Sequence, residues 1–269
     1  MSPERHSKAS LSAVLLDLDD TLYPERDFVR GGFRAAAKLL AERLPSLSRR
    51  VSDRFAADDS KTSLASRVGV PACDLRFEQL FLQHFEQGTR GSIFDKVLAD
   101  LGLPHEATLI DELVRAYRTH EPQLTLFSDA DRLLTWLESR QGLGILTDGP
   151  ADVQRRKVRA LDLPHRVEAI VYSDDFGREH WKPSSIPYLE LLRRLHAEPS
   201  HAVYVGDNPK KDFVGARRLG LQTVRIRRPN TEHGHAEPQP GFEADHEITS
   251  LDALPHWLAA NTRSERHAA

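Results

Sequence analysis

Short apolar runs recur along this sequence, and stretches with helical periodicity separate most of them. Such runs are typical of buried strands, and they occur at residues 13–16, 142–146, 167–172, 202–205 and 221–226. Helical patterns cover residues 129–140, 152–161, 185–195, 212–219 and 251–260. Because strands that alternate with helices form parallel sheets joined by right-handed crossovers, the sequence predicts an α/β fold.

A long helical insertion interrupts this alternation between the first two expected strands. Residues 24–127 are too many for one crossover, and their helical patterns cover residues 26–44, 75–87, 93–101 and 108–120. Prolines near both ends mark its limits, since proline breaks regular structure. We therefore expect a core domain of residues 1–23 and 122–269, with an α-helical cap domain of residues 24–121 over the strand ends.

The composition is that of an ordinary globular protein and excludes few functions. Hydrophobic residues make up 39% of the chain, charged residues make up 29%, and the net charge is −3. This charge gives no reason to expect a nucleic-acid or membrane partner. No apolar run is long enough to span a bilayer, and the polar N-terminus lacks the apolar middle of a signal peptide, so we expect a cytoplasmic protein. The oligomeric state cannot be read from these features.

Asp17 and Asp19 leave the carboxyl end of the first expected strand two positions apart. Residues two apart on an extended chain point to the same side, so both carboxylates should enter one small volume. Like charges that close repel each other unless a cation lies there or one carboxyl keeps its proton. An acid at a strand end can simply cap a helix or turn, but capping needs only one carboxylate. The pair therefore indicates a catalytic or metal-binding site.

Four short motifs occur in a fixed order, and three of them follow expected strands. They are Asp17-Leu18-Asp19-Asp20-Thr21, Leu146-Thr147-Asp148-Gly149, Trp181-Lys182-Pro183 and Gly206-Asp207-Asn208-Pro209-Lys210-Lys211-Asp212. This ordered set resembles the haloacid dehalogenase (HAD) superfamily, most of whose members are phosphohydrolases with an aspartate nucleophile. The resemblance covers residues 12–23 and 127–227 and implies a three-layer, Rossmann-like core. The helical insertion is similar in placement and size to the C1-type cap of that family.

The resemblance also assigns roles to the acids. It implies that Asp17 attacks phosphorus and that Mg²⁺ binds the side chains of Asp17 and Asp207 and the backbone carbonyl of Asp19. The Asp19 carboxyl would act as general acid and then as general base. We expect its pKa to be raised by neighbouring Asp17 and by partial burial.

The remaining motif residues would bind phosphate or support the acids. Thr147 would donate its hydroxyl to a phosphate oxygen, beside the backbone N–H groups of Asp148 and Gly149. Lys182 would add a positive charge near the nucleophile and the phosphate. Asp212 would orient Lys182 or the water shell of the metal. Asn208 would hydrogen-bond to residues of the site without contacting the substrate itself. For Asp148, a capping role for the side chain is an equally good interpretation. The third motif departs from the Lys-Pro-x-Pro run of many relatives, because Ser184 and Ser185 follow Pro183.

These features predict a Mg²⁺-dependent phosphatase that acts on a small phosphorylated metabolite, such as a sugar phosphate or a nucleotide monophosphate. A phosphomutase of the same superfamily is an alternative, and so is a catalytically idle binding protein on the same fold. A dehalogenase is disfavoured, because those relatives lack the second acid of the first motif. A leaving halide needs no proton, whereas a leaving alkoxide does.

Two further features bear on substrate choice. Arg26, Arg30, Arg34 and Lys38 form a basic stripe on the first cap helix. We interpret this stripe as solvated surface, the alternative being that Arg30 or Arg34 binds a second anionic group of the substrate. The loop at residues 228–245 carries His233 and His235, which we expect to be solvated rather than metal-bound.

Overall fold

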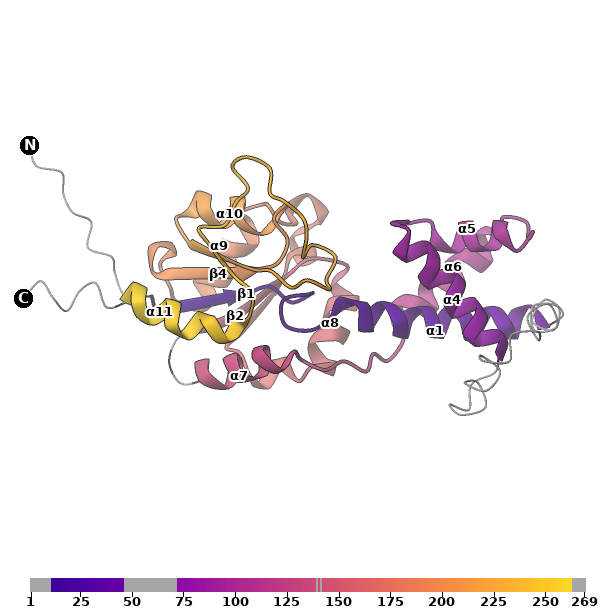
Figure 1. The fold of residues 1–269 in the computed structure, drawn as a ribbon, viewed down its shortest axis with the longest axis horizontal. Helices are drawn as coiled ribbons and strands as arrows, with labels where there is room; N and C mark the ends of the chain where they lie inside the picture. The colour runs from indigo at the N-terminus through magenta and orange to yellow at the C-terminus, as the bar shows by residue number, and fades with distance from the viewer. Residues whose placement is uncertain (1–10, 46–71, 139, 141, 263–269) are drawn as a thin grey trace, which may run out of the picture. The chain divides into compact units, whose positions relative to one another are not determined.

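A computed structural model describes residues 11–45, 72–138, 140 and 142–262 of the chain (Figure 1). The chain divides into two compact units. The sheet unit comprises the residues up to Glu25 together with those from Leu124 onward, and the helical unit comprises Arg26–Gln123. None of the described helices is both long and apolar enough to cross a lipid bilayer.

The sheet unit is built on six parallel strands in the order β3-β2-β1-β4-β5-β6. The strands are β1 (Ala13–Leu16), β2 (Gly142–Thr147), β3 (Ala169–Tyr172), β4 (Ala202–Gly206), β5 (Gln222–Ile226) and β6 (His246–Ile248). Leu16 at the end of β1 pairs with Ile145 of β2 and with Val205 of β4. From β1, the chain first adds β2 and β3 on one side and then β4, β5 and β6 on the other. In sheets of this kind, ligands bind beyond the carboxyl ends of the strands where the direction of winding changes.

Helices cover both faces of this sheet, which makes the three-layer α/β architecture that the sequence predicts. They are α7 (Ser128–Leu137), α8 (Ala151–Ala160), α9 (Ile186–Arg194), α10 (Asp212–Leu219) and α11 (Leu254–Thr262). Within this unit, α9 and α10 lie on one side of the strands, and α7 and α11 lie on the other (Figure 1). Leu15 and Leu16 point to opposite faces and both are fully buried. Burial of each such side chain contributes about 1.5–3 kcal/mol.

The strand predictions are confirmed except at the sheet edges. The strand predicted at 167–172 begins at Ala169, and β6 was not predicted. In β6 only Ile248 is buried, whereas His246 and Glu247 are exposed, so the strand has no apolar run by which it could be recognised. An edge strand covered on one side needs few apolar residues, and its pairing with β5 depends on backbone hydrogen bonds.

The helical unit contains α1 (Glu25–Arg43, whose first residue lies in the sheet unit), α4 (Ala72–Glu86), α5 (Ile93–Asp100) and α6 (Ala107–Thr119). Phe33, Phe81 and Phe94 form its aromatic core, with ring centroids 5.1–6.2 Å apart. Two glycines inside α1 make room for side chains of the α6 region. A Cβ on Gly32 would lie 2.4 Å from the Tyr117 ring, and one on Gly31 would lie 2.7 Å from His120. The glycine pair therefore allows close packing against α1.

The basic stripe of α1 is partly neutralised within the helical unit. Arg26 forms an ion pair with Glu86, and Arg34 lies 3.2 Å from a Glu78 carboxylate oxygen. The Arg34 side chain is still 62% exposed. These ion pairs favour the interpretation of the stripe as a solvated, charged helix surface.

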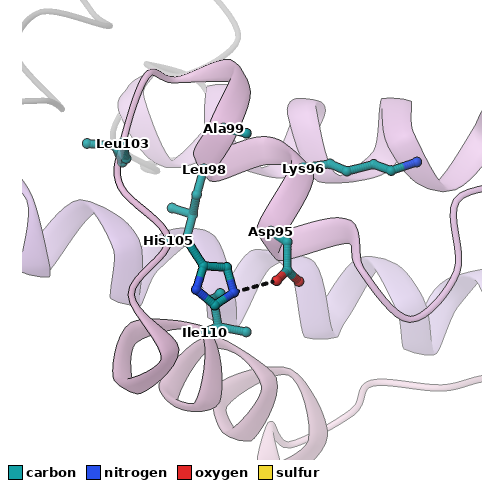
Figure 2. A pocket seen from close by; sticks show the side chains of 7 residues that line it. All are labelled: Asp95, Lys96, Leu98, Ala99, Leu103, His105 and Ile110. Atoms are coloured by element: carbon teal, nitrogen blue, oxygen red, sulfur yellow. Dashed lines mark hydrogen bonds and ion pairs between the residues drawn. The ribbon is translucent and has the colours of Figure 1, made fainter.

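A hollow of about 330 Å³ lies on α5, the loop after it and α6, and Figure 2 shows the residues that line it. Most of the lining is apolar, including Leu98, Leu103 and Ile110. His105 reaches across to Asp95, with 3.2 Å between the ring nitrogen and a carboxylate oxygen. The hollow contains none of the residues of the four sequence motifs, all of which lie in the sheet unit.

Candidate active site

An acidic pocket of about 230 Å³ lies at the carboxyl ends of the central strands. Its lining comes from all four motifs and from two residues outside them, Glu25 and His233. The lining residues are Asp17, Asp19, Asp20, Glu25, Asp148, Gly149, Trp181, Asp207, Asn208, Lys211 and His233. All of them belong to the sheet unit.

Lys182 lies at the base of this site as a fully buried cation. Its ammonium group donates to Asp17 Oδ1 at 2.6 Å, to Asp212 Oδ1 at 2.7 Å and to the Tyr204 hydroxyl at 2.9 Å. Burial alone would lower the pKa of Lys182, but Asp17 and Asp212 raise it well above the usual value. Lys182 therefore stays charged, and its hydrogen bond to Asp212 is compatible with one of the two roles expected for Asp212, the orientation of Lys182.

Asp17 and Asp207 form a pair of buried carboxyl groups beside Lys182. Burial raises the pKa of Asp17 to about 6 against the effect of Lys182, with Asp212 adding to the rise. Burial, Asp212 and Asp17 together raise the pKa of Asp207 well above its usual value. Among the described residues, Asp207 Oδ2 is buried and has no hydrogen-bond partner. A buried carboxylate oxygen without a donor fits a cation ligand.

Carboxylate oxygens of Asp17, Asp207 and Asp212 lie within 4.8 Å of one another, close enough to share a metal ion. The two Asp212 oxygens already accept hydrogen bonds, from Lys182 and Tyr204 at Oδ1 and from the Asn208 N–H at Oδ2. Asp207, whose Oδ2 has no hydrogen-bond partner among the described residues, is therefore a better candidate ligand than Asp212. Asp17 accepts from Lys182 at Oδ1 and, at 3.2 Å, from the Thr21 hydroxyl at Oδ2, and it lies beside Asp207 in the cluster. The acidic cluster fits a divalent cation, and its oxygen donors suit a hard ion.

Asp19 is held apart from this cluster by other donors. The Tyr23 hydroxyl and the Lys157 ammonium donate to Oδ1 at 2.5 and 2.7 Å, and the Gln154 amide donates to Oδ2 at 2.8 Å. Burial raises the pKa of Asp19, but the Lys157 charge and the three hydrogen bonds outweigh burial and lower it. The expectation of a raised pKa was wrong, because Lys157 lies 138 residues away in the sequence.

The second motif contributes a hydroxyl, a turn and a carboxylate. The buried Thr147 hydroxyl accepts a 2.5 Å hydrogen bond from Gln154, which leaves its own proton free to donate. Gly149 has φ +120°, a backbone conformation that favours glycine. Asp148 accepts from the backbone N–H of Lys182 at 3.1 Å and lies 3.4 Å from Lys211. Its side chain thus fixes the backbone at Lys182.

The loop at residues 228–245 folds against the pocket. Asn208 Nδ2 and His233 Nε2 are 2.8 Å apart, and His233 lines the pocket rather than pointing into solvent. Arg225 holds the loop by donating to the carbonyls of His233 and Ala236. His235 is exposed, as expected. Neither histidine belongs to a metal-ligating cluster in the part of the chain that the structure describes.

Sequence reasoning identified the motif residues of this pocket but not their partners. Gln154 and Lys157 are the main omissions, since both bond to Asp19. A usable signal was present on α8, where Val153, Gln154, Lys157 and Val158 form the buried face. Two polar side chains on a buried helix face need hydrogen-bond partners, and the polar groups of an active site can provide them.

The sequence model of the haloacid dehalogenase-like hydrolase family matches residues 11–220. This chain belongs to that family. Its relatives include the glyceraldehyde 3-phosphate phosphatase of Methanopyrus kandleri, 30% identical over 251 residues that cover 91% of this chain and 97% of the relative. The ribulose-1,5-bisphosphate 5-phosphatase of Halopiger xanaduensis is 28% identical, with 90% and 97% covered.

Solved structures of this hydrolase family have the same fold. The 2-haloacid dehalogenase from Pseudomonas syringae pv. Tomato aligns with a TM-score of 0.57 and 27% identity, covering 93% of this chain and 99% of that one. Because the chain belongs to a family of hydrolases, it is an enzyme. Its acidic pocket is lined by the motifs on which the resemblance to that family is based.

Proposed function

We propose that this hydrolase is a Mg²⁺-dependent phosphatase that acts on a small phosphorylated metabolite through an aspartyl-phosphate on Asp17. One observation carries the proposal: the pocket contains two carboxylates held by different lysines. Lys182 holds Asp17 beside Asp207, whereas Lys157 holds Asp19. Attack at phosphorus and proton exchange need two carboxylates in different surroundings, and this arrangement supplies them.

In the first step, an Asp17 oxygen bonds to phosphorus while the bond from phosphorus to the leaving alcohol breaks. Asp19 gives its proton to the leaving oxygen. In the second step, water attacks phosphorus, Asp19 takes the proton of that water, and the bond to Asp17 breaks. Inorganic phosphate leaves, and both carboxyl groups return to their starting states.

Asp19 must carry a proton for the first step, although its surroundings lower its pKa in the free protein. A phosphate dianion that enters the pocket raises this pKa again, because like charges repel. Substrate binding therefore favours the acid form of Asp19. Loss of the alcohol then leaves Asp19 as the base that the second step needs.

Charge neutralisation and phosphate binding fall to the remaining groups. Mg²⁺ would be held by Asp17 and Asp207, with the Asp19 backbone carbonyl, and would neutralise negative charge on the phosphate. The Thr147 hydroxyl and the backbone N–H groups of Asp148 and Gly149 would donate to phosphate oxygens. Asn208 and Asp212 would not contact the phosphate but would hold the residues that do. Asp212 would act through its hydrogen bond to Lys182.

Similarity to a 2-haloacid dehalogenase makes dehalogenation the second candidate. Asp19 and its donors argue against it, since a leaving halide needs no proton. The two relatives named above as phosphatases support water as the acceptor over a phosphomutase reaction. Their names favour sugar phosphates of three to five carbons as the first substrates to test. A full set of buried, mutually bonded site residues also disfavours an idle binding protein.

The test is a phosphate-release assay over a panel of metabolite phosphates and p-nitrophenyl phosphate, with and without Mg²⁺. We expect Mg²⁺-dependent release that falls roughly 10⁴-fold or more in Asp17→Asn. Asp152→Asn is the matched control, because Asp152 is an exposed acid on α8. Undiminished activity in Asp17→Asn would refute the nucleophile, and halide release from 2-haloacids without phosphate release would support the dehalogenase.

A further inference from the structure

Both oxygens of the Asp19 carboxylate accept hydrogen bonds in the free protein. Oδ1 accepts from Tyr23 and Lys157, and Oδ2 accepts from Gln154, at 2.5–2.8 Å. Tyr23 lies four residues after Asp19 in the same loop, so its hydroxyl can move together with the Asp19 carboxylate. Lys157 and Gln154 come from a different element, α8, and they approach the two oxygens separately.

Helix α8 presents these two residues as a unit. Gln154 and Lys157 are three positions apart, so they lie on one face of the helix, and both are almost fully buried. A buried lysine is costly unless it is paired, and Lys157 has carboxylates at 2.7 Å (Asp19) and 3.5 Å (Glu25). Gln154 also donates to Thr147 at 2.5 Å, so one amide contacts both an acid and a hydroxyl of the pocket.

The two buried lysines of the site do not share a carboxylate. Lys182 contacts Asp17 and Asp212, whereas Lys157 contacts Asp19 and Glu25. A purely structural ion pair could be formed anywhere in the core. Lys157 instead forms it with the one carboxylate that, under the proposed function, must change protonation state twice in each turnover.

We propose that Lys157 and Gln154 are positioning residues, which hold the Asp19 carboxylate in the orientation from which it exchanges protons. This inference rests on the proposed function for its chemistry. Proton transfer requires the two heavy atoms to be within hydrogen-bond reach, and a misplacement of about 1 Å can cost roughly 10²-fold in rate. A carboxylate fixed at both oxygens cannot rotate away from that position.

The first experiment compares Lys157→Met with Arg159→Met, which removes an exposed cation from the same helix. For an alkyl phosphate such as glycerol phosphate, we expect kcat to fall roughly 10²-fold in Lys157→Met, with KM changed by less than about threefold. With p-nitrophenyl phosphate the leaving group needs little protonation, so formation of the aspartyl-phosphate should stay fast. Its hydrolysis should be slow, which predicts a burst of p-nitrophenol equal to the enzyme concentration. Arg159→Met should behave as the parent protein.

Gln154→Met provides a second variant if loss of the buried charge prevents folding. It removes one donor to Asp19 without changing any charge, and it should give a burst of the same kind. Lys157→Arg should recover part of the alkyl phosphate activity, because it restores a cationic donor. Equal losses for both substrates in the rate of aspartyl-phosphate formation, a raised KM or the absence of a burst in both variants would overturn the proposal.

A crystal structure of Lys157→Met or Gln154→Met separates this inference from the proposed function. If the parent protein releases no phosphate from any substrate, the proposed function fails, and the side-chain position of Asp19 still tests the inference. We expect the Asp19 carboxylate to occupy more than one rotamer in the variants. A single, unchanged rotamer would show that Lys157 and Gln154 do not position it.

Discussion

At the scale of single residues, the site depends on which cation each carboxylate meets. Asp17 and Asp212 share Lys182, and Asp19 meets Lys157. Asp207 has no lysine or arginine within ion-pair distance among the described residues, and burial keeps its pKa high. The metal-free protein therefore carries an electrostatic cost at Asp207 that a divalent cation would remove.

This cost leads to a prediction about metal and stability. Asp207→Asn should raise the free energy of unfolding of the metal-free protein, because it removes one charge from a cluster of like charges. Mg²⁺ should stabilise the parent protein by about 2.7 kcal/mol when its concentration is roughly 100 times its Kd. It should add little to the variant. Thermal unfolding with EDTA and with Mg²⁺ measures both effects.

Asp175→Asn is the control for that comparison, since Asp175 is ion-paired with Arg155 outside the acidic cluster. Its response to Mg²⁺ should match that of the parent protein. Equal Mg²⁺ stabilisation of Asp207→Asn and the parent would mean that the ion binds elsewhere.

At the scale of elements, the glycine pair in α1 illustrates how packing overrides helix propensity. Alanine is favoured over glycine in a helix by about 1 kcal/mol. At Gly32, however, a Cβ would meet the Tyr117 ring at 2.4 Å. We therefore expect Gly32→Ala to destabilise the protein by about 1–3 kcal/mol through overpacking.

A double-mutant cycle in urea unfolding tests this explanation. In a Tyr117→Leu background, the same Gly32→Ala change should become neutral or stabilising, because the ring that it meets is gone. A Gly32→Ala variant more stable than the parent would show that Tyr117 moves aside at no cost.

The elements also show what sequence patterns can and cannot predict. The central strands were recognisable because both faces of a parallel sheet are buried, which gives uninterrupted apolar runs such as residues 13–16. Three of the four motifs could be placed at one edge because they follow strands that run in the same direction. Lys157 and Gln154 could not be placed, because a helical pattern defines a buried face but not the side chains across from it. The Asp19 pKa was wrong for the same reason.

At the scale of the whole sheet unit, one carboxylate joins segments that are far apart in the chain. Asp129, at the start of α7, accepts from both terminal nitrogens of Arg228 at 3.1 and 2.9 Å and from the Leu251 N–H at 2.9 Å. Arg228 also donates at 3.0 Å to the carbonyl of Thr21, the last residue of the first motif. A hydrogen bond thus joins the loop after β5 to the loop after β1, which carries the first motif.

Asp129→Asn should destabilise the protein by about 3 kcal/mol at neutral pH, because it leaves Arg228 without its carboxylate. Burial raises the pKa of Asp129, but the bonds from Arg228, Leu251 and Ser250 outweigh it and lower the pKa below the usual 3.8. A lowered folded-state pKa contributes stability above the unfolded value and loses it as pH falls through the folded value. The difference between parent and variant should therefore shrink below about pH 4.

Urea unfolding of both proteins between neutral pH and the onset of acid denaturation measures this difference. Asp245→Asn controls for loss of a carboxylate elsewhere in the sheet unit. A parent-to-variant difference that stays constant into the acid range would contradict the assignment of the stabilisation to ionised Asp129.

The junction between the two compact units lies inside the Asp19 network. Glu25 is the last residue of the sheet unit before the helical unit begins, and both Glu25 and Tyr23 contact members of that network. A chimaera that grafts a foreign insert in place of residues 26–123 would retain every donor to Asp19. One spliced at residue 22 would delete Tyr23 and Glu25 and leave Lys157 with half of its counter-charge. Modular exchange of the insert is therefore compatible with the chemistry only when the splice site lies beyond Glu25.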